Sequence, residues 1–257
     1  MQNIHRVTYA LLVLVLGTAV FAITRGRGQN AATAANKQAS TQGAERDNAV
    51  KKWYPTADYD EAEPSDPGKR AARKEAQKRH NKSPVGVMRT PHPEDAEVVA
   101  YSEGTLDFPA LPVGKSDLIV EADVLAAEAH LSENKRSVFS EFTIRVNKVF
   151  KTATATSPRQ GDVITIERVG GVVRYPNGRT LLYRNAGVGM PRVSGRYVFF
   201  LSAFKDSENY MILTGYEFGE KGIVPLDQSQ QFEAFTGYAA PAFITAIDDL
   251  LAKASSR

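Results

Sequence analysis

The sequence predicts a mainly β protein: a small antiparallel β-barrel with C-terminal helices, preceded by an N-terminal transmembrane helix and a disordered linker. Three observations predict this layout. Apolar and polar residues alternate with a period of two in several segments after residue 96, as is typical of half-buried antiparallel strands. Residues 7–24 carry no charged side chain, and residues 25–95 show no sustained apolar periodicity. The predicted parts are therefore residues 1–24, 25–95 and 96–257.

Composition excludes several classes of protein. The 257 residues are 42% hydrophobic and 24% charged, which is typical of a globular chain and excludes a collagen or a multi-span membrane protein. Cysteine is absent, so disulfide frameworks, thiolate zinc sites and cysteine nucleophiles are excluded together. Residues 25–95 hold fourteen basic and ten acidic side chains, and this excess exceeds the net charge of +3 because residues 96–257 are slightly acidic. The basic pI therefore does not argue that the folded part binds nucleic acid.

The uncharged segment of residues 7–24 is long enough to cross a membrane. Its eighteen residues span roughly 27 Å as a helix. We expect a single-pass anchor in the cell membrane, with the C-terminal domain in the periplasm or outside the cell. A cleaved signal peptide is the alternative, because Ala22 offers the small residue that a cleavage site needs. Arg25 and Arg27 resist export, so the positive-inside rule favours the opposite orientation.

Residues 25–95 form the predicted linker. They are rich in polar and small residues and cannot bury enough apolar surface to offset the entropy of ordering the chain. An acidic block spans residues 58–66, and a basic block with high helix propensity spans residues 69–82. The basic block has two interpretations: docking on an anionic surface, or a solvated spacer that includes a transient helix.

The folded part begins with two alternating segments, residues 117–124 and 137–150, joined by a polar hairpin loop at residues 132–136. A tight turn at residues 176–178 joins another predicted hairpin. Many short strands in so short a chain favour a closed or nearly closed barrel, which also removes edge strands. The remaining predicted strands are residues 163–169, 172–175, 180–183, 197–201, 210–213 and 222–224.

The C-terminal residues predict two helices. Asp227 is expected to cap a short helix that runs through Phe232 and Phe235. Pro241 suits the first turn of a second helix. One apolar stripe for docking on the sheet follows from the spacing of Phe243, Ile247, Leu250 and Leu251.

Three stretches carry a family resemblance: residues 116–120, residues 147–151 and residues 189–201. They resemble an uncharacterised group of exported or membrane-anchored bacterial β-domains. The strand order is similar to the netrin-like, OB-type barrel of tissue inhibitors of metalloproteinases, over residues 115–225. Those inhibitors direct an N-terminal cysteine at zinc, and this chain has no cysteine, so the resemblance implies a fold and no activity.

The sequence predicts no catalytic residues, no metal site and no cofactor. His130 is the one histidine in residues 96–257, and no serine lies in a Gly-x-Ser-x-Gly turn. No pair of histidines has the spacing of metal ligands, and no glycine-rich loop suits a nucleotide. We therefore expect a non-enzymatic domain that binds an envelope protein. An unrecognised hydrolase stays open, because two distant acids can converge in space.

An arginine-rich stretch offers an alternative binding function. Tyr175 and Tyr183 are interleaved with its arginines, and OB-type barrels bind oligosaccharides or nucleic acids on such faces. The candidate ligand-binding residues for an anionic polymer are Arg168, Arg174 and Arg184, which share one exposed face if the strand registers agree. Otherwise the arginines only solvate the barrel and pair with acids elsewhere.

Overall fold

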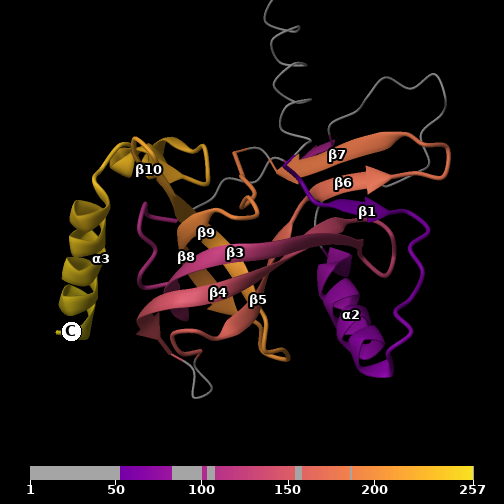
Figure 1. The fold of residues 1–257 in the computed structure, drawn as a ribbon, viewed down its shortest axis with the longest axis horizontal. Coiled ribbons are helices and arrows are strands. Elements are labelled where there is room, and N and C mark those ends of the chain that lie inside the picture. The colour runs from indigo at the N-terminus through magenta and orange to yellow at the C-terminus, as the bar shows by residue number, and fades with distance from the viewer. Residues whose placement is uncertain (1–52, 83–99, 103–107, 154–157, 186, 257) are drawn as a thin grey trace, which may run out of the picture. The chain divides into compact units, whose positions relative to one another are not determined.

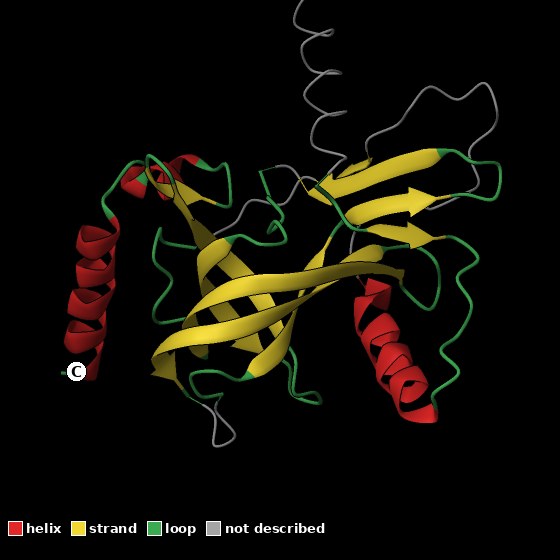
Figure 2. Ribbon diagram, viewed as in Figure 1, coloured by secondary structure: helices red, strands yellow, loops and turns green. Residues whose placement is uncertain are grey.

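The protein is described from a computed structural model, which covers residues 53–82, 100–102, 108–153, 158–185 and 187–256. Most elements in these residues are strands, and the last element is a helix (Figures 1 and 2). The predicted mainly β class is therefore confirmed. The predicted anchor at residues 7–24 lies outside the described residues. Among the helices of the described part, none combines the length and apolar character that a bilayer crossing requires.

The larger sheet has six strands in the order β10-β9-β5-β4-β3-β8. Within this order, β5 pairs parallel with β9 through Ile166 and Glu167. An additional antiparallel pairing joins β8 to β9. The pairings of β3, β4, β5, β9 and β8 therefore run in a circuit. The strands are β3 (Leu118–Leu131), β4 (Val138–Thr152), β5 (Val163–Val169), β8 (Arg196–Ala203), β9 (Tyr210–Gly219) and β10 (Gly222–Pro225).

The smaller sheet has four strands in the order β1-β6-β7-β2. Its central hairpin turns at Gly178, whose φ of 81° is the left-handed conformation that glycine favours, as the predicted turn requires. The two outer strands, β1 and β2, pair parallel with this hairpin. The strands are β1 (Thr56–Asp58), β2 (Ala100–Ser102), β6 (Gly171–Arg174) and β7 (Thr180–Asn185).

The C-terminal helix α3 (Ala240–Ser255) docks on the larger sheet through its apolar stripe. Phe243 and Ile247 are fully buried in one cluster with Phe200 and Tyr216, and Leu251 packs against that cluster. Leu250 stays exposed, so the predicted stripe is confirmed for its other members. Burial of these large side chains is the main apolar contribution to stability at this end of the sheet.

The prediction that residues 25–95 are disordered is wrong for residues 53–82. They contain β1, α2 (Pro67–Arg79) and the short helix η1 (His80–Lys82). The side chain of Asp66 caps α2 by accepting a hydrogen bond from the Lys69 amide at 2.7 Å. Only Ala76 of α2 is buried, so the helix has no apolar stripe from which the sequence could predict it. We call residues 53–82 the docked segment.

Candidate functional site

Three glutamates face one another across adjacent strands of the larger sheet. Glu128 on β3 pairs in register with Glu141 on β4, which pairs with Glu167 on β5. We call these residues the glutamate row. Residues directly opposite share one face of a sheet, and like charges so placed destabilise it. The row therefore needs counter-charges from outside the sheet.

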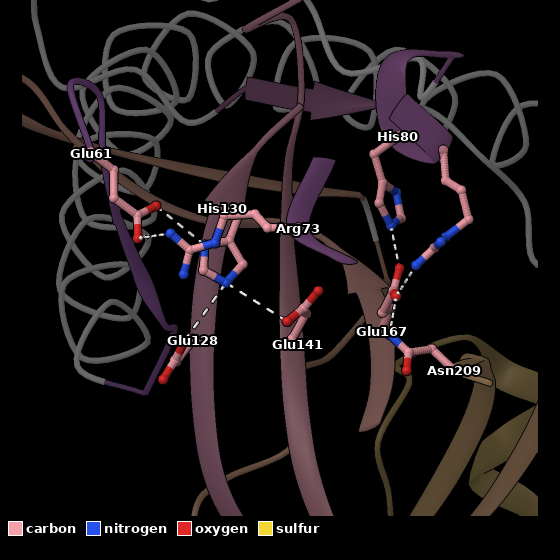
Figure 3. Close-up of polar contacts among 9 residues, drawn as sticks. Glu61, Arg73, His80, Glu128, His130, Glu141, Glu167 and Asn209 are labelled. Atoms are coloured by element: carbon pink, nitrogen blue, oxygen red, sulfur yellow. Dashed lines mark hydrogen bonds and ion pairs between the residues drawn. The ribbon is translucent and has the colours of Figure 1, made fainter. Parts of the chain in front are cut away.

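Glu167 is fully buried and receives three groups from elsewhere in the chain (Figure 3). The guanidinium of Arg79, at the end of α2, donates to one carboxylate oxygen at 2.5 Å. Nε2 of His80 lies 2.8 Å from the other oxygen. Nδ2 of Asn209, in the loop between β8 and β9, donates at 2.8 Å. A single buried carboxylate thus joins the docked segment to the sheet and to a distant loop.

The protonation of Glu167 follows from these partners. Burial alone would raise its pKa, because a charge is costly to remove from water. The hydrogen bonds from His80 and Asn209, together with the charge of Arg79, outweigh burial and hold the pKa below its ordinary value. The Glu167 carboxylate is therefore ionised at neutral pH.

Aromatic rings fix the two side chains that reach Glu167. The His80 ring stacks on Phe139 of β4, with centroids 4.1 Å apart and an interplanar angle of 16°. Phe204 meets the His80 ring edge-on, and the Arg79 guanidinium lies 4.7 Å from the centre of the Phe204 ring. The charged contact therefore sits in an aromatic setting that limits competition from water.

The other two glutamates of the row surround a buried histidine (Figure 3). Nε2 of His130 lies 3.8 Å from Glu128 and 3.7 Å from Glu141. Its Nδ1 lies 3.2 Å from Glu61 of the docked segment, which also accepts a hydrogen bond from Arg73 at 2.8 Å. The chain of polar contacts thus runs from α2 across the sheet surface.

Glu141 differs from Glu167 in its protonation. Burial raises the pKa of Glu141; the nearby His130 opposes this rise, and the neighbouring Glu167 and Glu128 reinforce it. The middle of the row is therefore easier to protonate than its buried end.

The hairpin loop between β3 and β4 also holds the docked segment through polar groups. Asn81 donates to Glu133 at 3.1 Å and accepts from the Asn134 amide at 3.0 Å. The ammonium of Lys135 donates to the Tyr59 carbonyl at 2.9 Å and lies 4.3 Å from the Tyr59 ring centre. The docked segment is thus attached at several points by hydrogen bonds and charges.

The structure does not bring the three predicted arginines onto one exposed face, and the prediction is wrong for Arg168. Arg168 is buried, and its Nη2 lies 2.8 Å from both carboxylate oxygens of Asp227. Arg174 is exposed and pairs with Asp58 at 3.0 Å. Arg184 is half-buried and hydrogen-bonds the side chain of Tyr54.

Asp227 also differs from its predicted role as a helix cap. The short helix η2 (Gln230–Phe235) has Ser229 at its cap position. Asp227 is instead fully buried, where it neutralises Arg168 and accepts a hydrogen bond from the Gly189 amide at 3.0 Å. A buried guanidinium requires such a partner, and this need outweighs the capping tendency of Asp227.

The comparisons with known proteins give no family for this chain. No family model matches this chain, and no curated protein matches it in sequence. A cavity of about 340 Å³ lies between α2 and the hairpin loop, lined by Glu61, Arg73 and Lys135 among others. Neither Glu167 nor His130 lines this cavity, and neither lines two further cavities of the described part. In that part no group of three or more acidic or histidine side chains could hold a metal ion.

Proposed function

We propose that the protein is a membrane-anchored, non-catalytic binding module whose glutamate row recognises a basic chain segment. In the resting molecule the docked segment occupies this row. One observation carries the proposal: Arg79, the charge partner of Glu167, and His80, which contacts its other oxygen, both come from outside the sheet that holds Glu167.

The energetics of the row support recognition of a separate segment. Each pair of opposed carboxylates destabilises the sheet by about 0.2–1 kcal/mol, so the bare row is unfavourable. A guanidinium beside an imidazole supplies charge-assisted hydrogen bonds, which are stronger than neutral ones. Within α2, Ala76 is the one buried side chain. A partner with similar chemistry can therefore replace α2 on the row.

We propose that the circuit of strand pairings is a small barrel of the OB type, in line with the netrin-like resemblance. The circuit contains antiparallel pairs and one short parallel pair, β5 with β9. OB barrels bind ligands on their second and third strands and in the loops after the first and fourth. The corresponding parts here are β4, β5 and the loops that carry Asn134 and Phe204. Asn134, Phe204 and Glu167 of β5 each contact the docked segment.

We also propose that residues 7–24 anchor the protein in the cell membrane and that the β-domain lies in the periplasm or outside the cell. The uncharged eighteen-residue stretch supports this placement. Protease added to intact spheroplasts is expected to digest the β-domain. Protection of the domain in intact spheroplasts, with digestion after lysis, would contradict the exported orientation.

The binding proposal is tested by vacating the row and offering the segment in trans. In the full chain, Arg79→Ala with His80→Ala removes the two groups that reach Glu167. A peptide of residues 66–82 is expected to bind this double variant roughly tenfold tighter than the wild type, because the intramolecular competitor is weakened. Calorimetry measures both affinities.

Two controls sharpen this test. Lys69→Ala with Lys78→Ala also replaces two basic side chains of the docked segment by alanine, at exposed positions of α2, and is expected to leave the wild-type affinity unchanged. Adding Glu167→Gln to the double variant is expected to abolish binding. Equal affinity of the peptide for the wild type and the double variant would show that the row is not a recognition surface.

The remaining sequence-based alternatives stay predictions. Binding of an anionic polymer now depends on Arg174 and Arg184 without Arg168, whose charge is taken by Asp227. A hydrolytic activity likewise stays a prediction.

A further inference from the structure

Three exposed apolar side chains gather around one turn at the start of the described body. Trp53 is 59% exposed, Val193 is 50% exposed and Leu125 is 38% exposed. Single exposed apolar residues are normal on proteins and need no explanation. Three of them next to an arginine form a surface of definite chemistry, which we call the Trp53 edge: Trp53, Leu125, Val193 and Arg192.

Backbone hydrogen bonds hold the Trp53 edge in a fixed geometry. The Ser194 amide donates to the Val124 carbonyl at 2.8 Å, and the Val124 amide donates to Gly195 at 2.9 Å, which sets Leu125 beside the turn. The Arg192 guanidinium lies 5.8 Å from the centre of the Trp53 ring. Glu217 holds that guanidinium at 2.6 Å. The turn that carries Arg192 and Val193 is therefore fixed against β3, and the Trp53 ring lies beside the arginine of that turn.

The chemistry of the Trp53 edge fits the membrane–water interface. An indole has an apolar body and one N–H group, and tryptophan is enriched at the level of the lipid headgroups for this reason. A neighbouring guanidinium suits headgroup phosphates, which it binds in a planar, bidentate fashion. The aliphatic side chains of Val193 and Leu125 add apolar area for the acyl boundary.

The position of the edge in the chain also fits a bilayer. Trp53 follows the uncharged stretch at residues 7–24 after the twenty-eight residues 25–52. A chain of that length reaches at most roughly 100 Å even when fully extended. Such a short tether raises the local concentration of the edge at the membrane, so that even a weak contact is populated.

We propose that the Trp53 edge rests on the phospholipid bilayer in which the protein is anchored, with the Trp53 ring at the headgroup level. This inference rests on the proposed anchoring by residues 7–24. It adds that the β-domain has a preferred orientation on the membrane.

Trp53 is the sole tryptophan of the chain, so its fluorescence reports this contact alone. The full chain is reconstituted in vesicles of phosphatidylcholine and phosphatidylglycerol, with and without bromine on the acyl chains near the headgroup. Bromine is expected to quench roughly half of the emission, because the ring lies at the depth tryptophan favours. Flotation of the vesicles separately measures the anchoring.

Matched variants separate contact from mere proximity. Val193→Asp places a charge in the edge and is expected to remove the quenching. Val224→Asp places the same charge on β10, at a valine of similar exposure (44%), and is expected to leave the quenching unchanged. Both variants are expected to float with the vesicles.

The outcomes distinguish the two proposals. Flotation without quenching of the wild type overturns the membrane contact and leaves the anchoring intact. Equal quenching in both aspartate variants also overturns it, because proximity through the tether then explains the signal. Failure of the protein to float overturns the anchoring and the contact together.

Discussion

Glu167 is fully buried and yet held in its charged form, because its hydrogen bonds and Arg79 lower its pKa more than burial raises it. Replacing it by glutamine leaves Arg79 and His80 without an anion, and breaking such a buried pair costs about 3 kcal/mol. Because its pKa is lowered in the folded protein, its contribution is present above the ordinary glutamate value of 4.5 and is lost as pH falls through the folded value. Urea unfolding of Glu167→Gln and wild type is expected to show a gap at pH 7 that closes in acid. A gap independent of pH would contradict this assignment.

Glu141 is expected to behave in the opposite way. Burial raises its pKa, so the folded protein favours the neutral side chain, and the stability gained from it is lost as pH rises. Glu141→Gln is expected to stabilise the protein at neutral pH by about 1 kcal/mol, because it removes the repulsion between the Glu141 carboxylate and the carboxylates of Glu128 and Glu167. The same urea titrations measure this gain, which should vanish in acid. A destabilised variant would mean that the ionised Glu141 is needed by His130.

The individual residues of the candidate site were largely hidden from sequence-based prediction. Alternation on residues 163–169 places Glu167 on the polar side of a strand, but nothing local marks it as buried. Its partners Arg79 and Asn209 lie 88 and 42 positions away in the chain. Arg168, by contrast, looked exposed, because its partner Asp227 lies 59 positions away. Long-range charge pairing decides both cases, and no short pattern records it.

At the scale of elements, the strands were predictable because one face of each is buried. Alternation located the hairpin of β3 and β4, and residues 163–169 match β5. The helix α2 was not predicted as a stable element, because it buries only Ala76 and its apolar residues show no helical period. Its basic composition indicated helix propensity. The partners that hold the helix in place lie far away in the chain, so the sequence pattern did not predict them.

The N-terminal cap should make a local contribution to the stability of α2. Asp66→Ala removes the side chain that accepts from the Lys69 amide, which costs about 1 kcal/mol. Hydrogen exchange of the α2 amides is expected to quicken roughly fivefold while exchange in β3 and β4 stays unchanged. Asp249→Ala, at an exposed position of α3, serves as the control and should leave α2 unaffected. Uniform acceleration across β3 and β4 would show that α2 is part of the main cooperative unit.

At the scale of the whole described body, two kinds of cohesion coexist. The larger sheet and α3 are held by a cluster of fully buried side chains such as Phe200 and Phe243. The helical part of the docked segment, residues 66–82, is held chiefly by ion pairs and hydrogen bonds to the glutamate row and the hairpin loop, whereas β1 pairs with β6. Apolar packing is insensitive to pH, and the charged contacts are not. The two parts should therefore respond differently to acid.

Acid is expected to release the docked segment before the sheet unfolds. Protonation of Glu167 removes the charge that holds Arg79, and this occurs as pH falls below 4.5 towards the lowered folded pKa. Hydrogen exchange, corrected for its intrinsic pH dependence, should show residues 66–82 losing protection in acid while β8 and β9 keep theirs. Glu167→Gln should already show this loss at pH 7 and change little on acidification. Simultaneous loss of protection in α2 and β8 would contradict separate release, because the segment would then unfold only with the body.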